Sequence, residues 1–278
     1  MNWGGRTLRM IFAWAAPWLA LIPCANAQDM LLPLPTEHEH PLAPTIRFAE
    51  ERCEFIRKNI RDYSCRLIKR ERIDGELQDY QFLQMKVRCE LVGDENVAQP
   101  MAVFMRYLGP DSLKDRRVLY VDGQRNGQML VRKGGRALRT LVVHINPDSN
   151  AARRESKYSV TEVGFDRIVA RLILMAQNDI KHDPQAENTE VSYHTNAKIG
   201  QRMCTHIKVD HPRPALGLEF HQASLFIDNE LLVPTRLVVH GWPANEGEEP
   251  PLLEEYTYTD LQLNIGLTDA DFSETLLE

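Results

Sequence analysis

The chain has 278 residues, of which 43% are hydrophobic and 26% are charged. This is ordinary globular composition, with enough apolar material for one large core. The formal net charge of −6 argues against nucleic acid as a partner, because phosphate binding needs a basic surface.

Residues 1–27 have the pattern of a secretory signal peptide. Arg6 and Arg9 form a short basic region, residues 10–22 are apolar, and an Ala-Asn-Ala sequence ends at Ala27. The apolar run is too short to span a bilayer, which takes about 20 residues. We therefore expect an exported protein, periplasmic or secreted after cleavage near Ala27, with no transmembrane segment.

The cysteines leave more than one possibility open. Cys24 is an alternative lipidation site, but the proline directly before it fits a lipoprotein signal poorly. Cys53, Cys65, Cys89 and Cys204 would remain after cleavage, and in an oxidising compartment they can pair or stay as buried thiols.

Residues 28–44 contain several prolines and no periodic apolar pattern, which predicts a flexible N-terminal arm before a single domain at 45–278. A helix follows the arm. Apolar residues recur there at spacings of three and four and form one stripe: Ile46, Ala49, Cys53, Ile56 and Ile60.

The segment 63–89 predicts a long hairpin with alternating apolar residues in both strands. A two-residue turn at Asp74 would place the two apolar sets on opposite faces. A three-residue loop at 74–76 places Leu67 opposite Leu83, so that both sets share one face. The same register puts Cys65 opposite Met85. It separates Cys65 from Cys89, whereas Cys53 on the helix could reach either.

The other face of this hairpin is not fully polar. Ile68, Tyr80 and Phe82 interrupt its charged residues. We therefore expect both faces of the sheet to be partly covered there.

The rest of the chain is mainly strand-like, with runs at 101–109, 116–123 and 127–133 and again from 188 onward. The stretch 134–160 is irregular by composition, and a wide apolar face predicts a helix at 165–177. With about ten or eleven antiparallel strands, the predicted class is α+β, with a large curved antiparallel sheet that forms a half-open barrel.

The sequence contains no Gly-rich phosphate loop, nucleophile elbow or zinc-type signature, so we expect no catalytic residue, metal or cofactor. The best cluster is Cys204, His206, Asp210 and His211, which offers zinc ligands or a Cys-His dyad. An outer strand face followed by a turn is the simpler interpretation.

The C-terminal segment 256–272 carries one family resemblance. It looks like the closing strand and tail of outer-membrane lipoprotein-sorting proteins of the LolA-like superfamily. The matching residues are Tyr256, Tyr258, Asn264, Gly266, Leu267, Asp269 and Phe272.

The segment from Tyr63 to Gly127 resembles an uncharacterised bacterial family with the same fold, known mainly from planctomycete genomes. The matching residues are Tyr63, Glu71, Gly75, Lys86, Arg88, Pro100, Val103, Leu119, Tyr120, Gly123 and Gly127. The chain departs from that family at 89–100, where the connection is longer, and at Met101 and Ala102, which replace phenylalanine and serine.

These resemblances imply a LolA/LolB-like half-barrel with helices against its concave face, where the enclosed space takes lipid or acyl chains. Apolar inward positions with no convergent polar site suit a lipid better than a polar metabolite. The candidate cavity residues are Tyr63, Leu67, Met85, Val87, Met105 and Tyr120.

The resulting hypothesis is an exported, non-enzymatic protein that binds or carries lipid or the acyl chains of a lipidated protein. The alternative is a structural module of the cell envelope that binds another envelope protein. A second alternative is a metal-dependent or Cys-His enzyme.

Overall fold

The computed structural model describes residues 36, 38–92, 97–134 and 141–278. The predicted signal peptide at 1–27, Cys24 and most of the predicted arm lie outside the described residues. Within the described part, no helix has the length and apolar character needed to cross a membrane.

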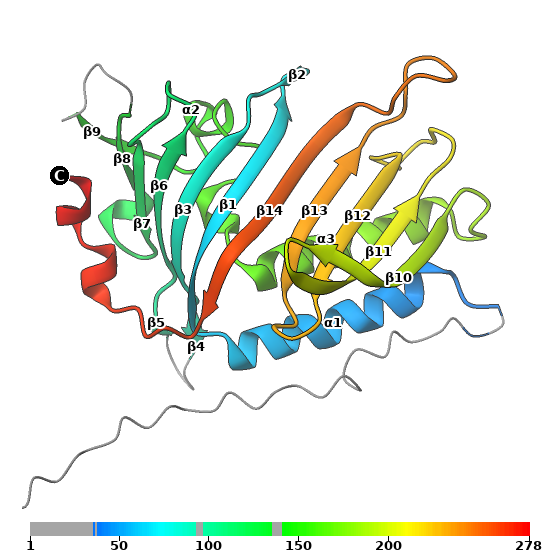
Figure 1. The fold of residues 1–278 in the computed structure, drawn as a ribbon, viewed down its shortest axis with the longest axis horizontal. Coiled ribbons are helices and arrows are strands. Elements are labelled where there is room, and N and C mark those ends of the chain that lie inside the picture. Colours follow the sequence, from blue (N-terminus) through cyan, green and yellow to red (C-terminus); the bar gives the residue numbers. More distant parts are fainter. Residues whose placement is uncertain (1–35, 37, 93–96, 135–140) are drawn as a thin grey trace, which may run out of the picture.

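One curved sheet of 12 strands, with every neighbouring pair antiparallel, forms the body of the protein (Figure 1). The predicted α+β class with a half-open antiparallel barrel is confirmed, with slightly more strands than expected. In spatial order the strands are β10 (Glu190–Ile199), β11 (Arg202–Asp210), β12 (Gln222–Asp228), β13 (Pro234–His240), β14 (Leu252–Leu263), β1 (Asp62–Ile73), β3 (Gln81–Arg88), β6 (Ala102–Gly109), β7 (Arg117–Val121), β8 (Met129–Arg132) and β9 (Val142–Ile145), with β2 (Glu76–Leu77) beside β1.

Two long helices pack against each other and lie along one side of the sheet (Figure 1). They are α1 (Leu42–Asn59) and α3 (Phe165–His182). The predicted helices are confirmed, but α1 begins inside the predicted arm because Pro44 lies in the first helical turn, where no backbone N–H is needed. Helix α3 extends beyond the predicted end at 177.

The predicted register of the opening hairpin is confirmed. Leu67 lies opposite Leu83, and Cys65 lies opposite Met85. All four side chains are at most 6% exposed, so the shared apolar face of the hairpin is the inner face of the sheet.

The turn that produces this register is not the predicted three-residue loop. Ile73 pairs with Glu76, so the turn has two residues, Asp74 and Gly75, both with positive φ angles of 50° and 86°. This is the conformation of a type I′ turn. The register shifts by one residue at 78–80, between β2 and β3, and this irregularity replaces the longer loop.

The stretch 134–160 is more regular than its composition predicted. It contains β9 at the edge of the sheet, and a short helix α2 (Asn150–Arg153) capped by the Ser149 side chain. The longer connection at 89–100 forms a separate hairpin of β4 (Leu91–Val92) and β5 (Val97–Gln99).

The outer face of the sheet is covered only in part. Tyr80 and Phe82 are 41% and 43% exposed. Cover is present instead over β6, β7 and β8, where two 3-10 turns, η4 (Asp269–Phe272) and η5 (Glu274–Leu277), bury Phe272 and Leu277.

Lys86 and Arg88, which match the uncharacterised family, lie on the outer face of β3 and hold this C-terminal segment. Lys86 forms an ion pair with Asp271 at 2.7 Å, and Arg88 forms one with Asp269 at 2.6 Å. The Arg88 guanidinium also lies 5.1 Å from the centre of the Phe272 ring. Asp271 also completes a capping box with Thr268, so the two aspartates help to close the final turn.

Phe272→Ala should lower the free energy of unfolding by about 3 kcal/mol, because it empties a buried aromatic site. The measurement is urea unfolding followed by tryptophan fluorescence. Ile265→Ala, at a site 43% exposed in the same tail, is the control and should change stability by less than about 0.5 kcal/mol. Equal effects of the two substitutions would contradict the proposed packing of the tail.

Candidate functional site

A cavity of about 280 Å³ lies between the concave face of the sheet and the segment that leads into α3. Its floor is formed by β1, β3, β6, β7, β8, β9, β13 and β14, and its roof by residues 147–163 and the first turns of α3. The apolar wall consists mainly of Leu67, Leu83, Met85, Met105, Val118, Met129, Val131, Val143, Ile145, Ile168 and Leu237.

One end of the cavity is polar and almost completely buried. Glu71 on β1 lies directly opposite Glu254 on β14, and both side chains are 2% exposed. The Tyr256 hydroxyl lies 2.5 Å from Glu71 Oε1 and 3.4 Å from Glu254 Oε2. Two carboxylates held this close in the interior need cations and hydrogen-bond donors around them.

Two lysines and a serine supply those partners. Lys69 Nζ lies 2.8 Å from Glu71 Oε2 and donates to Ser156 Oγ at 2.9 Å. Lys157 Nζ lies 3.0 Å from Glu254 Oε2. The cluster therefore connects the sheet to the segment that forms the roof of the cavity.

The tyrosines of this end act as neutral hydrogen-bond donors. Tyr158 donates to Glu254 Oε1 at 3.0 Å. Burial, and then the charge of Glu254, raises the pKa of Tyr158 and that of Tyr256. Burial also raises the pKa of Tyr258, a third tyrosine of the cavity wall. These hydroxyls therefore keep their protons at neutral pH and remain available to acceptors.

Simple strand alternation places these groups inside the barrel. Lys69 and Glu71 continue the inward series of β1 that begins with the apolar residues Tyr63, Cys65 and Leu67. On β14, Glu254 and Tyr256 share the inward face in the same way. The expectation of an inner face with no convergent polar site is therefore wrong, because the inward series turns from apolar to charged along the strands.

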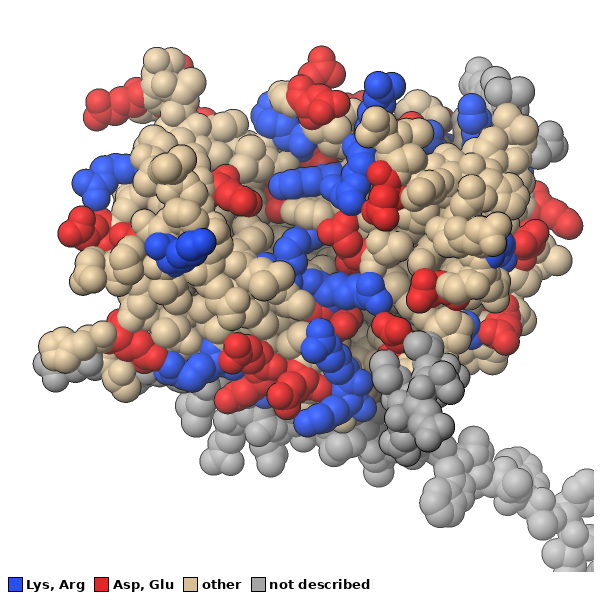
Figure 2. Space-filling model, turned by 180° about the vertical axis from the view of Figure 1, so that it is seen from behind, with Lys and Arg blue, Asp and Glu red and all other residues tan. Residues whose placement is uncertain are grey.

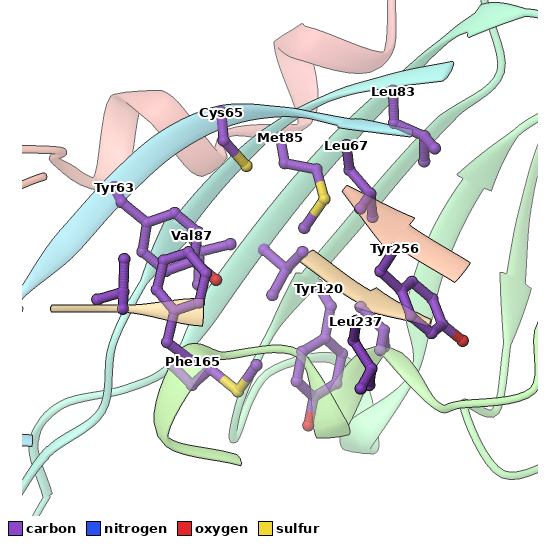
Figure 3. Close-up of a cluster of buried hydrophobic side chains, with 14 of the residues drawn as sticks. Tyr63, Cys65, Leu67, Leu83, Met85, Val87, Tyr120, Phe165, Leu237 and Tyr256 are labelled. Carbon is purple, nitrogen blue, oxygen red and sulfur yellow. The ribbon is translucent and has the colours of Figure 1, made fainter. Parts of the chain in front are cut away.

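The candidate cavity residues fall into two groups. Leu67, Met85 and Met105 line the cavity. Tyr63, Val87 and Tyr120 point into the same interior but belong to the packed core beside the cavity (Figure 3). Tyr63 stacks on Phe165 of α3 at 4.4 Å, Val87 is 1% exposed, and Tyr120 donates to Asp122.

Five residues that match the uncharacterised family, called the family-motif residues here, have identifiable structural positions: Glu71, Gly75, Lys86, Arg88 and Gly123. Gly75 and Gly123 take positive φ angles in turns. Lys86 and Arg88 hold the C-terminal segment, and Glu71 belongs to the polar end of the cavity. Of these five residues, Glu71 is the one in the cavity wall.

The cluster proposed as a metal or Cys-His site is divided by the sheet. Cys204 is fully buried against Thr235, with Sγ 3.6 Å from its hydroxyl. His206 stacks on Phe226 with ring centres 4.2 Å apart. His211 instead contacts Asp179 of α3, with Nε2 3.2 Å from Oδ2. Among the described residues, no group of three or more candidate ligands is arranged to hold a metal ion.

The cysteines described by the structure, Cys53, Cys65, Cys89 and Cys204, are free thiols. Burial raises the pKa of Cys65 and of Cys89 to about 12, so both thiols are protonated at neutral pH. A protonated, buried thiol is a weak nucleophile, which agrees with a structural role for these side chains.

Sequence reasoning missed Tyr158, Arg171 and Glu254. Glu254 carried a signal, because it alternates with Tyr256 and Tyr258 along one strand. Tyr158 lay in a stretch expected to be irregular, and Arg171 lay on a helix interpreted only through its apolar face. Neither position had a local pattern that indicates a cavity wall.

Together these features define a class of protein: a half-open antiparallel barrel with an internal cavity that is apolar along most of its wall and charged at one end. The chain matches the family described as "Protein of unknown function (DUF1571)" over residues 60–276, and it belongs to that family. The predicted membership of an uncharacterised family is confirmed.

Several solved structures are similar to this chain. A DUF1329 family protein from Desulfovibrio piger is 12% identical, with a TM-score of 0.41, over 84% of this chain and 99% of that one. A LolA superfamily protein from Nitrosomonas europaea is 9% identical, with a TM-score of 0.33, over 83% and 98%. The lipoprotein LppX from Mycobacterium tuberculosis is 12% identical, with a TM-score of 0.42, over 81% and 98%.

No curated protein matches the chain. Since the identities to the solved structures are low, the function has to be inferred from this chain's own side chains.

Tyr256→Phe should lower the free energy of unfolding by about 1–3 kcal/mol, because two buried carboxylates lose a shared donor. The measurement is again urea unfolding. Tyr80→Phe is the matched control, since its exposed hydroxyl donates to Glu255 on the outer face. A Tyr256→Phe protein as stable as the control would show that the hydroxyl does not hold the two carboxylates.

Proposed function

We propose that the protein binds the hydrocarbon chain of a lipid, or of a lipidated protein, in the cavity beneath α3. The observation that carries this proposal is the cavity itself, about 280 Å³ in volume and walled mainly by leucine, methionine, valine and isoleucine. An apolar cavity of about 150 Å³ already takes up benzene and stays dry. A space of this size and composition favours an apolar guest over water.

The flexible side chains of the cavity wall would accommodate ligands of different shapes. Met85, Met105 and Met129 contribute flexible, polarisable side chains to one wall. Methionines adapt to irregular apolar partners because three rotatable bonds let them repack. This composition fits a carrier that accommodates a chain better than a site that orients a reacting group, and binding requires no catalytic residue.

We further propose that the protein acts after export, in the periplasm or outside the cell, as the basic and apolar pattern of residues 1–27 indicates. Its surface agrees with a partner other than nucleic acid. Figure 2 shows basic and acidic side chains interleaved over the side opposite to that of Figure 1, without a broad basic patch. A lipid or a lipidated protein is the proposed partner.

Native mass spectrometry tests the proposal directly. Residues 28–278 are expressed in a bacterial periplasm and weighed under native and then denaturing conditions. Extra mass that leaves on denaturation and fragments as lipid is the expected result. A bare protein that also fails to bind any single-chain amphiphile added in vitro would overturn the proposal.

Met85→Asp should reduce binding of an apolar fluorescent probe at least about tenfold, because it places a carboxylate in the apolar wall. Gln84→Asp is the matched control, since the neighbouring side chain on the same strand is exposed on the outer face. Probe binding is measured by fluorescence titration, and circular dichroism confirms the fold of each variant.

Met105→Trp provides a second variant that fills the cavity without adding a charge. It should also weaken probe binding, even if Met85→Asp does not fold. Undiminished binding by a folded Met85→Asp or Met105→Trp protein would contradict this placement of the ligand.

A further inference from the structure

Arg171 is a charged residue in the cavity wall whose guanidinium has no counter-ion in the described structure. It lies on α3 and lines the cavity. Its guanidinium carbon is 3.5 Å from the centre of the Tyr158 ring, and its Nε is buried without a hydrogen-bond partner. Among the described residues, no carboxylate forms an ion pair with it.

Three other cations of the same wall differ from Arg171 in this respect. Lys69 is paired with Glu71 at 2.8 Å, Arg116 with Glu155 at 2.7 Å, and Arg236 with Glu255 at 2.5 Å. Each of these charges is neutralised by the protein. Among the described residues, Lys133 also lines the wall without an ion pair, but its side chain is exposed to solvent. Arg171 differs because it is half-buried and its Nε is buried without a partner.

The polar end of the cavity has one positive charge in excess. Lys69, Lys157 and Arg171 carry positive charge, whereas Glu71 and Glu254 are the carboxylates of the cluster. Tyr158 connects the two parts, because its ring lies against Arg171 and its hydroxyl donates to Glu254. One additional anion would balance the cluster.

The physical chemistry of a guanidinium indicates that the excess positive charge would bind an anion. Arginine keeps its charge at every physiological pH, and burying a charge without a counter-ion is costly. The stacked tyrosine ring stabilises the cation but leaves the in-plane N–H donors unused. Those donors fit the oxygens of a carboxylate or phosphate, which they can bind in pairs.

The volume restricts what the anion can be attached to. A cavity of about 280 Å³ lies just below the range for small-molecule pockets, about 300–1,000 Å³. This space suits one hydrocarbon chain with a compact head group.

We propose that the cavity selects a single-chain amphiphile with an anionic head group, and that Arg171 binds that head group while the apolar wall takes the chain. The inference rests on the proposed function, because it names the class of ligand for the same cavity. Two head groups have this chemistry: a carboxylate, as in a free fatty acid, and a phosphate, as in an alkyl phosphate.

The test compares decanoic acid, decyl phosphate and decan-1-ol as competitors of the neutral dye N-phenyl-1-naphthylamine at pH 8. The three ligands share one chain, so differences in affinity report the head group. We expect at least one anion to bind about tenfold or more tighter than the alcohol, as a charge-assisted hydrogen bond predicts. The stronger of the two anions identifies the head group.

The variants assign this preference to one residue. Arg171→Met should lower the affinity for the preferred anion about tenfold or more and leave that for decan-1-ol unchanged. Arg171→Lys should retain part of the preference, because it keeps the charge but loses the paired donors. Arg167→Met is the matched control: it removes the same charge one turn earlier on α3, where Arg167 donates to the Thr161 carbonyl.

The outcomes separate this inference from the proposed function. If the alcohol binds the wild-type protein as tightly as both anions, or if Arg171→Met weakens all ligands equally, the role of Arg171 is overturned and the apolar cavity stands. If neither the dye nor any decyl ligand binds, the proposed function fails and the inference fails with it. The wild-type comparison decides the matter even if Arg171→Met does not fold.

Discussion

The cavity depends on two carboxylates that face each other across neighbouring strands. Glu71 and Glu254 are buried at the same level of the sheet, and such a pair is stable only when donors and cations surround it. Ser156 accepts a hydrogen bond from Lys69, which is paired with Glu71. Lys157 and Tyr158 contact Glu254 directly. The need to neutralise buried charge therefore fixes the roof segment over the sheet, and the enclosed space follows from it.

The family-motif residues serve two separate purposes in this arrangement. Lys86 and Arg88 stabilise the outer face by holding the C-terminal segment, where Asp269 and Asp271 complete the ion pairs. Glu71 belongs to the inner face and to the cavity. A motif in one hairpin can thus combine residues that stabilise the fold with a residue that lines the cavity, because successive side chains of a strand point to opposite faces.

The fold was largely predictable from the sequence, and the polar end of the cavity was not. Period-2 alternation fixed the pairing of Leu67 with Leu83, since any other register would move apolar side chains to the solvent face. The prediction of a three-residue loop was wrong because a two-residue turn and an irregularity at 78–80 give the same register as a longer loop. Strand alternation places Glu71 and Glu254 on the inner face, but their contacts with residues 156–158 join distant segments and leave no local pattern in the sequence.

The charged end changes what kind of ligand the barrel can hold. A wholly apolar cavity would accept any hydrocarbon of suitable size, because burial of apolar surface has no directional preference. In the proposed complex, Arg171, which has no counter-ion among the described residues, would orient the guest, since one end gains a charge-assisted contact and the other gains only burial. The same residue also disfavours neutral guests, because they leave its charge uncompensated. Selectivity for an amphiphile over a plain hydrocarbon then follows from a single side chain on α3, held in position by the tyrosine ring beneath it.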